Sequence, residues 1–560
     1  MKHRNSFVIK SSALIALMLM LCTTAFAQIE DAANSVFTLT TFKADGSILA
    51  SSHGVFVGNS GEAIGIWKPF VGASSAVVVD AKGNKMDVES VIGANELYDV
   101  CKFRVKGRTA GARVATVPSP KGSKAWLLGY SVRKADISQR NVQNTEKFMD
   151  KYTYYIFSST VPENAEGCPF VNAKGEVIGL LQHSKTGSDV YATDAQLANS
   201  FKVENGLAIN SSVLRQTSIR IDFPQSPEQA QIMLMLSAQQ PDSMLHVKYV
   251  DAFISQFPTS IDGYTQRAQS QLNADQFSNV AATMETAIQK VAKKDEAHSN
   301  YSRLIFQKEI YKADKPFAAW SLDKALDEAK QAYSINALPT YQHQQAQVYF
   351  AKGEYQTAYD MFMALTKSNI RSGEFFYEAV QCKQQLKAPQ NEFMALLDSA
   401  IAASPQPLNA VGAPYVLARG NAWLNAGEFR KAVDDFNQYD SLMQGRPLSS
   451  DFYFAREQAE LKIHQYQQAV NDINRAVYLD YKNPLLWAEK ASLHLRFNQL
   501  DDAVKSADAS IRLNPKSTDG YVIKGVALIH QKKKTEGIEA LNKAKELGDP
   551  RADEYLKKYR

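Results

Sequence analysis

The C-terminal half of the chain repeats one pattern of large and small residues about every 34 positions. In the clearest unit Trp487, Ala491, Ala503 and Pro515 occupy the fourth, eighth, twentieth and thirty-second places. The matching residues of other units are Tyr521, Gly525, Gly537, Leu541 and Ala544; Tyr453, Tyr466, Ala469, Ile473 and Ala476; Gly420, Trp423, Phe429, Ala432 and Phe436; Ala346, Tyr349, Tyr355, Ala358 and Phe362; and, more loosely, Tyr264, Ala268, Phe277, Met284 and Ala287. Such a period predicts stacked helix pairs, in which small residues let helices approach and large residues fill the gap to the next unit.

This spacing resembles that of the tetratricopeptide repeat. About eight units fit between residues 243 and 560, although insertions at 312–321 and 443–450 lengthen two of them and the units around Ala325 and Ala379 are degenerate. The resemblance implies an all-α solenoid with a concave face that binds a protein or peptide. A generic helical bundle is the alternative, but several units in one frame argue against it.

In this family the first helix of each unit lines the groove, and here that face carries mixed polar side chains. The candidate peptide-binding residues are Asn421, Asn425, Gln458, Lys462, Ser492, Arg496 and His530, with Val526 on the same face. They lack the lysine and asparagine set with which some members of the family clamp a C-terminal carboxylate. A solvated helix face is the alternative for each residue.

Residues 28–207 differ from the C-terminal half in their residue pattern, and they predict β-structure. Short runs rich in β-branched and aromatic residues alternate with turn signals, and they lie at 35–42, 54–57, 76–79, 124–129, 154–158 and 176–181. This spacing suits a barrel or a sandwich. Pro224 and Pro227 mark the change to a helical period, so residues 208–242 are expected to form a linker and a first helix.

Four segments of the β-rich half are informative in their order and spacing. They are residues 54–64, 98–105, 122–130 and 164–179. Between about residues 33 and 201 they resemble the trypsin-like serine proteases of the bacterial high-temperature-requirement type. The resemblance implies an all-β double barrel, so the predicted fold is multidomain: a trypsin-like double barrel followed by an all-α tetratricopeptide-repeat solenoid.

Two catalytic positions of that family hold different residues here. Lys68 stands in place of the histidine and Glu166 in place of the serine, whereas Asp99 is retained. Asn164 replaces a glycine of the oxyanion hole. Acyl transfer needs a hydroxyl whose proton passes to a neutral imidazole, and a carboxylate would oppose the developing oxyanion. The resemblance and these replacements together predict a pseudoprotease domain that is not an enzyme and has no catalytic residues.

In the family fold the base lies between the nucleophile and the aspartate. Transferring these positions puts the Lys68 ammonium between Glu166 and Asp99, which predicts an ion pair; two side chains that point to water are the equal alternative.

Other combinations of a nucleophile and a base leave catalysis as an alternative. They are Cys168 with His53 or His183, and Lys68 with Ser158 or Ser159. The alternative function is therefore an active serine-type endopeptidase that uses its repeats to recruit substrates or partners, and a structural spacer in an envelope assembly is a third.

The first 27 residues predict a cleaved Sec signal. A basic start precedes an apolar run at 13–22, and Ala25, Phe26 and Ala27 form the cleavage motif. The run is shorter than the roughly 20 residues of a membrane span, and no later stretch reaches that length. The mature chain is expected to be exported, either to the periplasm or outside the cell, without a membrane span.

Charge and cysteine content exclude some functions. The net charge of +5, from 63 basic and 58 acidic residues without a basic cluster, predicts no nucleic-acid partner. Cys101, Cys168 and Cys382 lack the paired spacing of a zinc site, and no cofactor motif occurs, so neither a metal nor a cofactor is expected. A disulfide between Cys101 and Cys168 is one possibility and three buried thiols are the other. The sequence does not define the oligomeric state.

Overall fold

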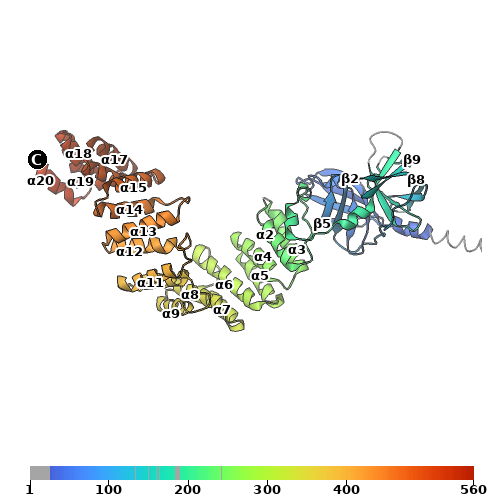
Figure 1. Cartoon of the computed structure of the whole chain (residues 1–560), viewed down its shortest axis with the longest axis horizontal. Helices are drawn as coiled ribbons and strands as arrows, with labels where there is room; N and C mark the ends of the chain where they lie inside the picture. The colour runs from blue at the N-terminus through green and yellow to red at the C-terminus, as the bar shows by residue number, and fades with distance from the viewer. Residues whose placement is uncertain are drawn as a thin grey trace, which may run out of the picture. The chain divides into compact units, whose positions relative to one another are not determined.

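A computed structural model describes residues 26–132, 134–148, 151–158, 161–162, 164–182, 189–240 and 242–559. The chain divides into two compact units, the first reaching Ala297 and the second spanning His298–Arg560. Strands occupy the N-terminal part of the chain and helices the rest (Figure 1). The predicted signal segment lies outside the described residues, except for Phe26 and Ala27.

The first six strands close into an antiparallel barrel. They are β1 (Val36–Phe42), β2 (Ile48–Phe56), β3 (Glu62–Gly65), β4 (Ser75–Asp80), β5 (Lys85–Asn95) and β6 (Val100–Val105), in the order β1-β2-β3-β6-β5-β4. Alternation along β1 buries Phe37, Leu39 and Thr41, because successive strand side chains point to opposite faces.

A second antiparallel barrel follows. Its strands are β7 (Lys124–Gly129), β8 (Asp136–Phe148), β9 (Tyr152–Ser158), β10 (Pro169–Val171), β11 (Val177–Gln182) and β12 (Asp189–Asp194), in the order β10-β11-β12-β9-β8-β7. The rings of Phe157 and Phe170 stack in its core with centroids 4.0 Å apart. Two closed six-stranded barrels confirm the predicted double-barrel architecture.

Residues beyond the strands complete the core of the first barrel. The stretch around Ile221 bridges to Val91 of β5. Tyr249 and Phe253, on α3 (Ser243–Gln256), pack edge-on against Phe223 in the same apolar cluster as strand residues of the first barrel. The segment expected as a linker, 208–242, therefore belongs to a continuous core that extends into α3.

Helices follow one another along the remainder of the chain. They are α2 (Pro227–Ser237), α3, α4 (Ile261–Asn273), α5 (Phe277–Lys290), α6 (Lys294–Tyr311), α7 (Leu322–Ile335), α8 (Pro339–Ala351), α9 (Tyr355–Leu365), α10 (Gly373–Gln385), α11 (Gln390–Ala402), α12 (Ala413–Asn425), α13 (Phe429–Leu442), α14 (Ser450–Lys462), α15 (Tyr466–Leu479), α16 (Pro484–Arg496), α17 (Leu500–Leu513), α18 (Thr518–His530), α19 (Lys534–Glu546) and α20 (Pro550–Tyr559). Within each unit most helices pack against the next, as expected for repeated helix pairs.

The first helices of the repeats share a length and a stop signal. Seven first helices of the described chain, α4, α8, α10, α12, α14, α16 and α18, have 13 residues each. Two residues after each of them ends, the backbone enters the left-handed region, at Asp275, Gly353, Lys387, Gly427, His464, Asn498 and Lys532. A left-handed residue at this place ends a helix and turns the chain back.

Candidate functional site

The turn that carries Glu166 is tightly fixed against β2. The main-chain N–H of His53 donates to the Glu166 carbonyl at 2.9 Å, and the Gly167 N–H donates to the Leu181 carbonyl at 2.9 Å. Gly167 has a φ of +83°, and a Cβ there would lie 2.2 Å from the His53 carbonyl oxygen. The backbone of the turn is thus set by its neighbours, while the half-buried Glu166 side chain stands at its tip and Asn164 nearby is exposed.

Lys68 contacts Asp99 through its main chain, not through its side chain. Lys68 begins the short helix η1 (Lys68–Phe70), and its main-chain N–H donates to the Asp99 carboxylate at 2.7 Å. Burial raises the pKa of Asp99, although N–H groups of Lys68 and Trp67 oppose the shift. The Lys68 side chain is exposed, and no ion pair within 4.0 Å joins it to Asp99 or Glu166 in the described chain. The expected ion pair is therefore wrong, because the carboxylate takes a main-chain donor and the ammonium faces water.

The three cysteines of the described chain are free and buried. This confirms the free-thiol interpretation and makes the Cys101–Cys168 disulfide wrong. Cys168 packs in the core of the second barrel, where burial raises its pKa to about 12. A thiol with that pKa remains protonated at neutral pH and is a poor nucleophile.

His53 stands next to the Glu166 turn, and its imidazole ring is engaged with residues other than Cys168. Its Nδ1 lies 3.4 Å from the Thr38 hydroxyl, and its ring stacks on Tyr130 with centroids 5.8 Å apart. Burial lowers the pKa of His53, opposed by main-chain hydrogen bonds at Asn164 and Phe37. Of the other alternative partners, His183, Ser159 and the Ser158 side chain lie outside the described residues.

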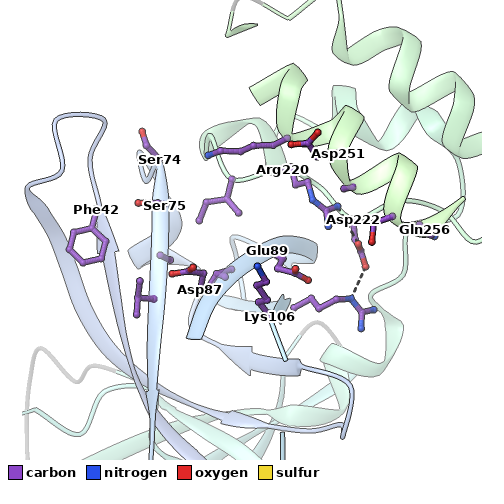
Figure 2. Close-up of a pocket in the computed structure, with 18 of the residues that line it drawn as sticks. Phe42, Ser74, Ser75, Asp87, Glu89, Lys106, Arg220, Asp222, Asp251 and Gln256 are labelled. Atoms are coloured by element: carbon purple, nitrogen blue, oxygen red, sulfur yellow. Dashed lines mark hydrogen bonds and ion pairs between the residues drawn. The ribbon is translucent and has the colours of Figure 1, made fainter. Parts of the chain in front are cut away.

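A cavity of about 1120 Å³ lies between strands of the first barrel and α3 (Figure 2). Figure 2 shows Ser74 and Ser75 of the barrel across the cavity from Asp251 and Gln256 of the helix. Acidic and basic side chains both line it, and the Asp222 carboxylate accepts a hydrogen bond from Arg104 at 3.2 Å. The mixed wall favours neither sign of ligand, and sequence reasoning did not anticipate this cavity.

The predicted groove residues lie on four first helices of the second unit: α12, α14, α16 and α18. Exposed members are Asn421, Asn425, Lys462, Arg496 and His530; Gln458 and Ser492 are half-buried, and Val526 is buried. The Gln458 amide donates to the Glu457 carboxylate at 2.7 Å, and the His530 Nε2 lies 3.1 Å from the Tyr559 hydroxyl. The set therefore offers hydrogen-bonding groups and positive charge from Lys462 and Arg496.

Buried carboxylates beneath these groups were missed by sequence reasoning. Glu457 occupies the eighth place of α14, where the neighbouring first helices have Gly420 and Ala491, and it is fully buried. Burial first, and then the charges of Glu489 and Glu460, raise the pKa of Glu457 to about 8. One Glu457 oxygen has no hydrogen-bond partner within the described structure. The sequence signal that could have revealed this buried carboxylate is a charged residue at a repeat position where the neighbouring first helices have small residues.

Double barrels of this kind are consistent with a trypsin-like fold, and the helical region carries tetratricopeptide repeats. The sequence matches the tetratricopeptide-repeat family over residues 454–518 and 488–552.

Two fungal relatives share this part of the chain. The small glutamine-rich tetratricopeptide repeat-containing protein 2 of Saccharomyces cerevisiae is 30% identical over 93 residues, which are 17% of this chain and 27% of that protein. The DnaJ homolog subfamily C member 7 homolog of Schizosaccharomyces pombe is 24% identical over 195 residues, or 32% of this chain and 38% of that protein. The chain thus spans well under half the length of these curated relatives.

None of the helices in the described ranges combines the length and apolar character that crossing a bilayer requires.

Proposed function

We propose that this is an exported, non-catalytic scaffold protein whose repeat groove binds a protein or peptide. The observation that carries the proposal is the row of exposed polar side chains on successive first helices, from Asn421 on α12 to His530 on α18. Surfaces of this kind on helical repeats are extended binding faces. The groove would supply hydrogen bonds from amide groups and positive charge from Lys462 and Arg496.

The barrel contributes no serine-protease chemistry in this proposal. Glu166 provides no hydroxyl at the tip of its turn, and Lys68 provides no imidazole. The Lys68 side chain is exposed, and it makes no ion pair within 4.0 Å with Asp99 or Glu166 among the described residues. The buried, protonated thiol of Cys168 argues against a displaced nucleophile.

Partner binding is tested by paired groove and control variants. Arg496→Lys combined with Asn421→Ala should weaken partner capture from the envelope fraction at least about tenfold, the equivalent of about 1.4 kcal/mol. The matched control changes exposed residues of second helices, Arg512→Lys with Asn471→Ala, and should capture normally. Melting temperature and helix content should be the same in both, because exposed substitutions shift stability by only about 0.5 kcal/mol. Equal capture by the two double variants would exclude the groove as the receptor.

Catalytic inactivity is tested with a fluorophosphonate probe, which labels an activated serine. The mature chain should remain unlabelled under conditions in which an active trypsin-like protease is fully modified. Stoichiometric labelling of any serine would instead favour the endopeptidase alternative.

Export is tested by sequencing the N-terminus of protein recovered outside the cytoplasm. Cleavage after Ala27 predicts a terminus at Gln28. A mature pool that retains Met1 would contradict the signal-peptide interpretation.

A further inference from the structure

Three side chains with metal-ligating atoms converge on two neighbouring first helices of the second unit. His343 lies on α8, and Glu374 and Glu378 lie on α10. One ligand atom from each residue lies within 4.8 Å of the other two. The four-residue spacing of the glutamates puts both carboxylates on one face of α10.

Contacts with surrounding residues hold the His343 and Glu378 side chains in place. The His343 Nε2 lies 2.6 Å from a Glu378 oxygen, and the other Glu378 oxygen accepts from the Gln347 amide at 2.9 Å. The imidazole packs edge-on against Phe362 and Phe375, with centroid distances of 5.8 and 4.9 Å. Such outer contacts orient metal ligands in proteins. Glu374 is exposed, whereas the other two side chains are half-buried.

The charge of this cluster is not balanced by a lysine or an arginine. Within the described residues no ion pair joins either glutamate to a basic side chain other than His343. Burial, followed by the charges of Glu374 and Glu378, raises the pKa of the nearby Tyr415. Two adjacent carboxylates with one imidazole therefore present an excess of negative charge.

A second histidine–glutamate pair of the same unit shows the contrast. His298 Nδ1 lies 2.6 Å from Glu328, the same separation as in the first pair. There, however, the Lys324 ammonium donates to the other Glu328 oxygen at 2.6 Å. A lysine neutralises that carboxylate, so the pair is a structural contact without an open ligand set.

We propose that His343, Glu374 and Glu378 bind one divalent transition-metal ion of the zinc type, with water completing its coordination. One imidazole and two carboxylates form a donor set that zinc accepts. Ligand atoms around tetrahedral zinc are about 3.3 Å apart, given metal–ligand distances of about 2.0–2.2 Å. The site therefore closes when the ion replaces the 2.6 Å hydrogen bond between His343 and Glu378, which moves these two atoms apart, and Glu374 turns inward. The ion would tie α8 to α10 across consecutive repeats. This inference goes beyond the proposed function and does not depend on it.

Residue spacing does not reveal this site, and no metal was expected from the sequence. His343 and Glu378 are 35 residues apart and belong to different repeats. Only the packing of consecutive repeats, in which α9 contacts both α8 and α10, brings them together.

The test is Zn²⁺ titration of the chelator-stripped mature chain by calorimetry, with Co²⁺ absorption as a second readout. Wild type should bind one equivalent more than His343→Gln. Glu374→Gln, which alters an exposed side chain and should keep the fold, should weaken that equivalent at least about tenfold. The matched control His298→Gln should bind like wild type, and circular dichroism should confirm that all variants are folded.

Three results would overturn the proposal. They are the absence of saturable Zn²⁺ binding to the wild type, equal Zn²⁺ binding by wild type and both site variants, and an equal loss of binding in His298→Gln.

Discussion

Single residues in this chain are constrained by neighbours that the repeat and barrel patterns do not reveal. Gly167 illustrates this on the Glu166 turn, since both its positive φ and its closeness to the His53 carbonyl exclude a side chain. Gly46, in the hairpin between β1 and β2, has nearly the same φ, +81°, but nothing lies within 4 Å of the place that a Cβ would occupy. Comparing Gly167 with Gly46 therefore separates the cost of backbone strain from the cost of a steric clash.

We expect Gly167→Ala to destabilise the barrels by well over 1 kcal/mol, because strain and a clash with backbone add together. Gly46→Ala should cost only about 1 kcal/mol, from strain alone. Chemical denaturation followed by near-ultraviolet circular dichroism measures both. Equal losses would mean that the turn relaxes away from His53.

Glu457 predicts a pH dependence of the repeats. Its folded pKa of about 8 exceeds the ordinary 4.5, so the folded state binds the proton more tightly than the unfolded state. The free energy of unfolding around α14 should therefore fall as pH rises from about 4.5 to about 8. Glu457→Gln should reduce this slope and stabilise the region at pH 8 by about 1–3 kcal/mol. Part of the slope should remain, because burial also raises the pKa of Glu460 on α14 to about 8.

Hydrogen exchange of α14 and α16 amides at pH 5.5 and 8 measures this effect. Glu536→Gln, a change of an exposed glutamate on α19, serves as the control and should leave the slope intact. An unchanged slope in Glu457→Gln would show that this carboxyl is already ionised in the folded chain.

At the scale of elements, arginine clamps join two of the first helices, α12 and α14, to the helices on both sides. Arg456 of α14 binds both oxygens of Asp472 on α15, at 2.6 and 3.0 Å, and Asp440 on α13 at 2.8 Å. Arg419 of α12 repeats the arrangement with Asp435 and Asp398. The clamp thus fixes both the pair within a unit and the contact to the unit before it.

Arg456→Gln should destabilise the repeats by about 3–5 kcal/mol, because it leaves the buried Asp472 without its charged partner. Arg456→Lys should recover only part of this loss, since an ammonium cannot form the two-pronged contact. The exposed pair of Lys505 and Asp502 provides a control, and Lys505→Gln should change the melting curve little. A mild effect of Arg456→Gln would show that Asp472 finds water instead.

Elements differed in how far their sequence revealed them. The 13-residue first helices follow from the repeat frame, and apolar strands such as β1 and β7 follow from their composition. β8 was not predicted because Asp136–Phe148 is mostly polar, and β10 has only three residues. The repeat frame placed the candidate groove residues, which remain a prediction. The His343 cluster depends on contacts between repeats and could not be predicted from residue spacing.

At the scale of the whole molecule, the first compact unit includes more than its strands. Met233, Leu234, Tyr249 and Phe253 from α2 and α3 belong to the same buried cluster as Phe103. A fragment of residues 28–242 should therefore expose apolar surface and aggregate, whereas residues 28–292 should fold. Burial of the Tyr249 and Phe253 rings is worth about 2–3 kcal/mol each.

Dye binding and thermal melting of the two fragments measure this difference. Equal stability would mean that the barrel core closes without α3.

The shared core also bears on the order in which the chain matures. All six strands of the second barrel are available once Asp194 has been made, and its buried cluster lies between Ala115 and Ala192. The first barrel waits for Tyr249 and Phe253 before its cluster is complete. During directional passage out of a ribosome or a translocation channel, the barrel that emerges first is therefore the one that finishes last. Until α3 has emerged, the apolar residues of the first barrel that α3 later covers remain exposed. They form the surface on which a chaperone would act.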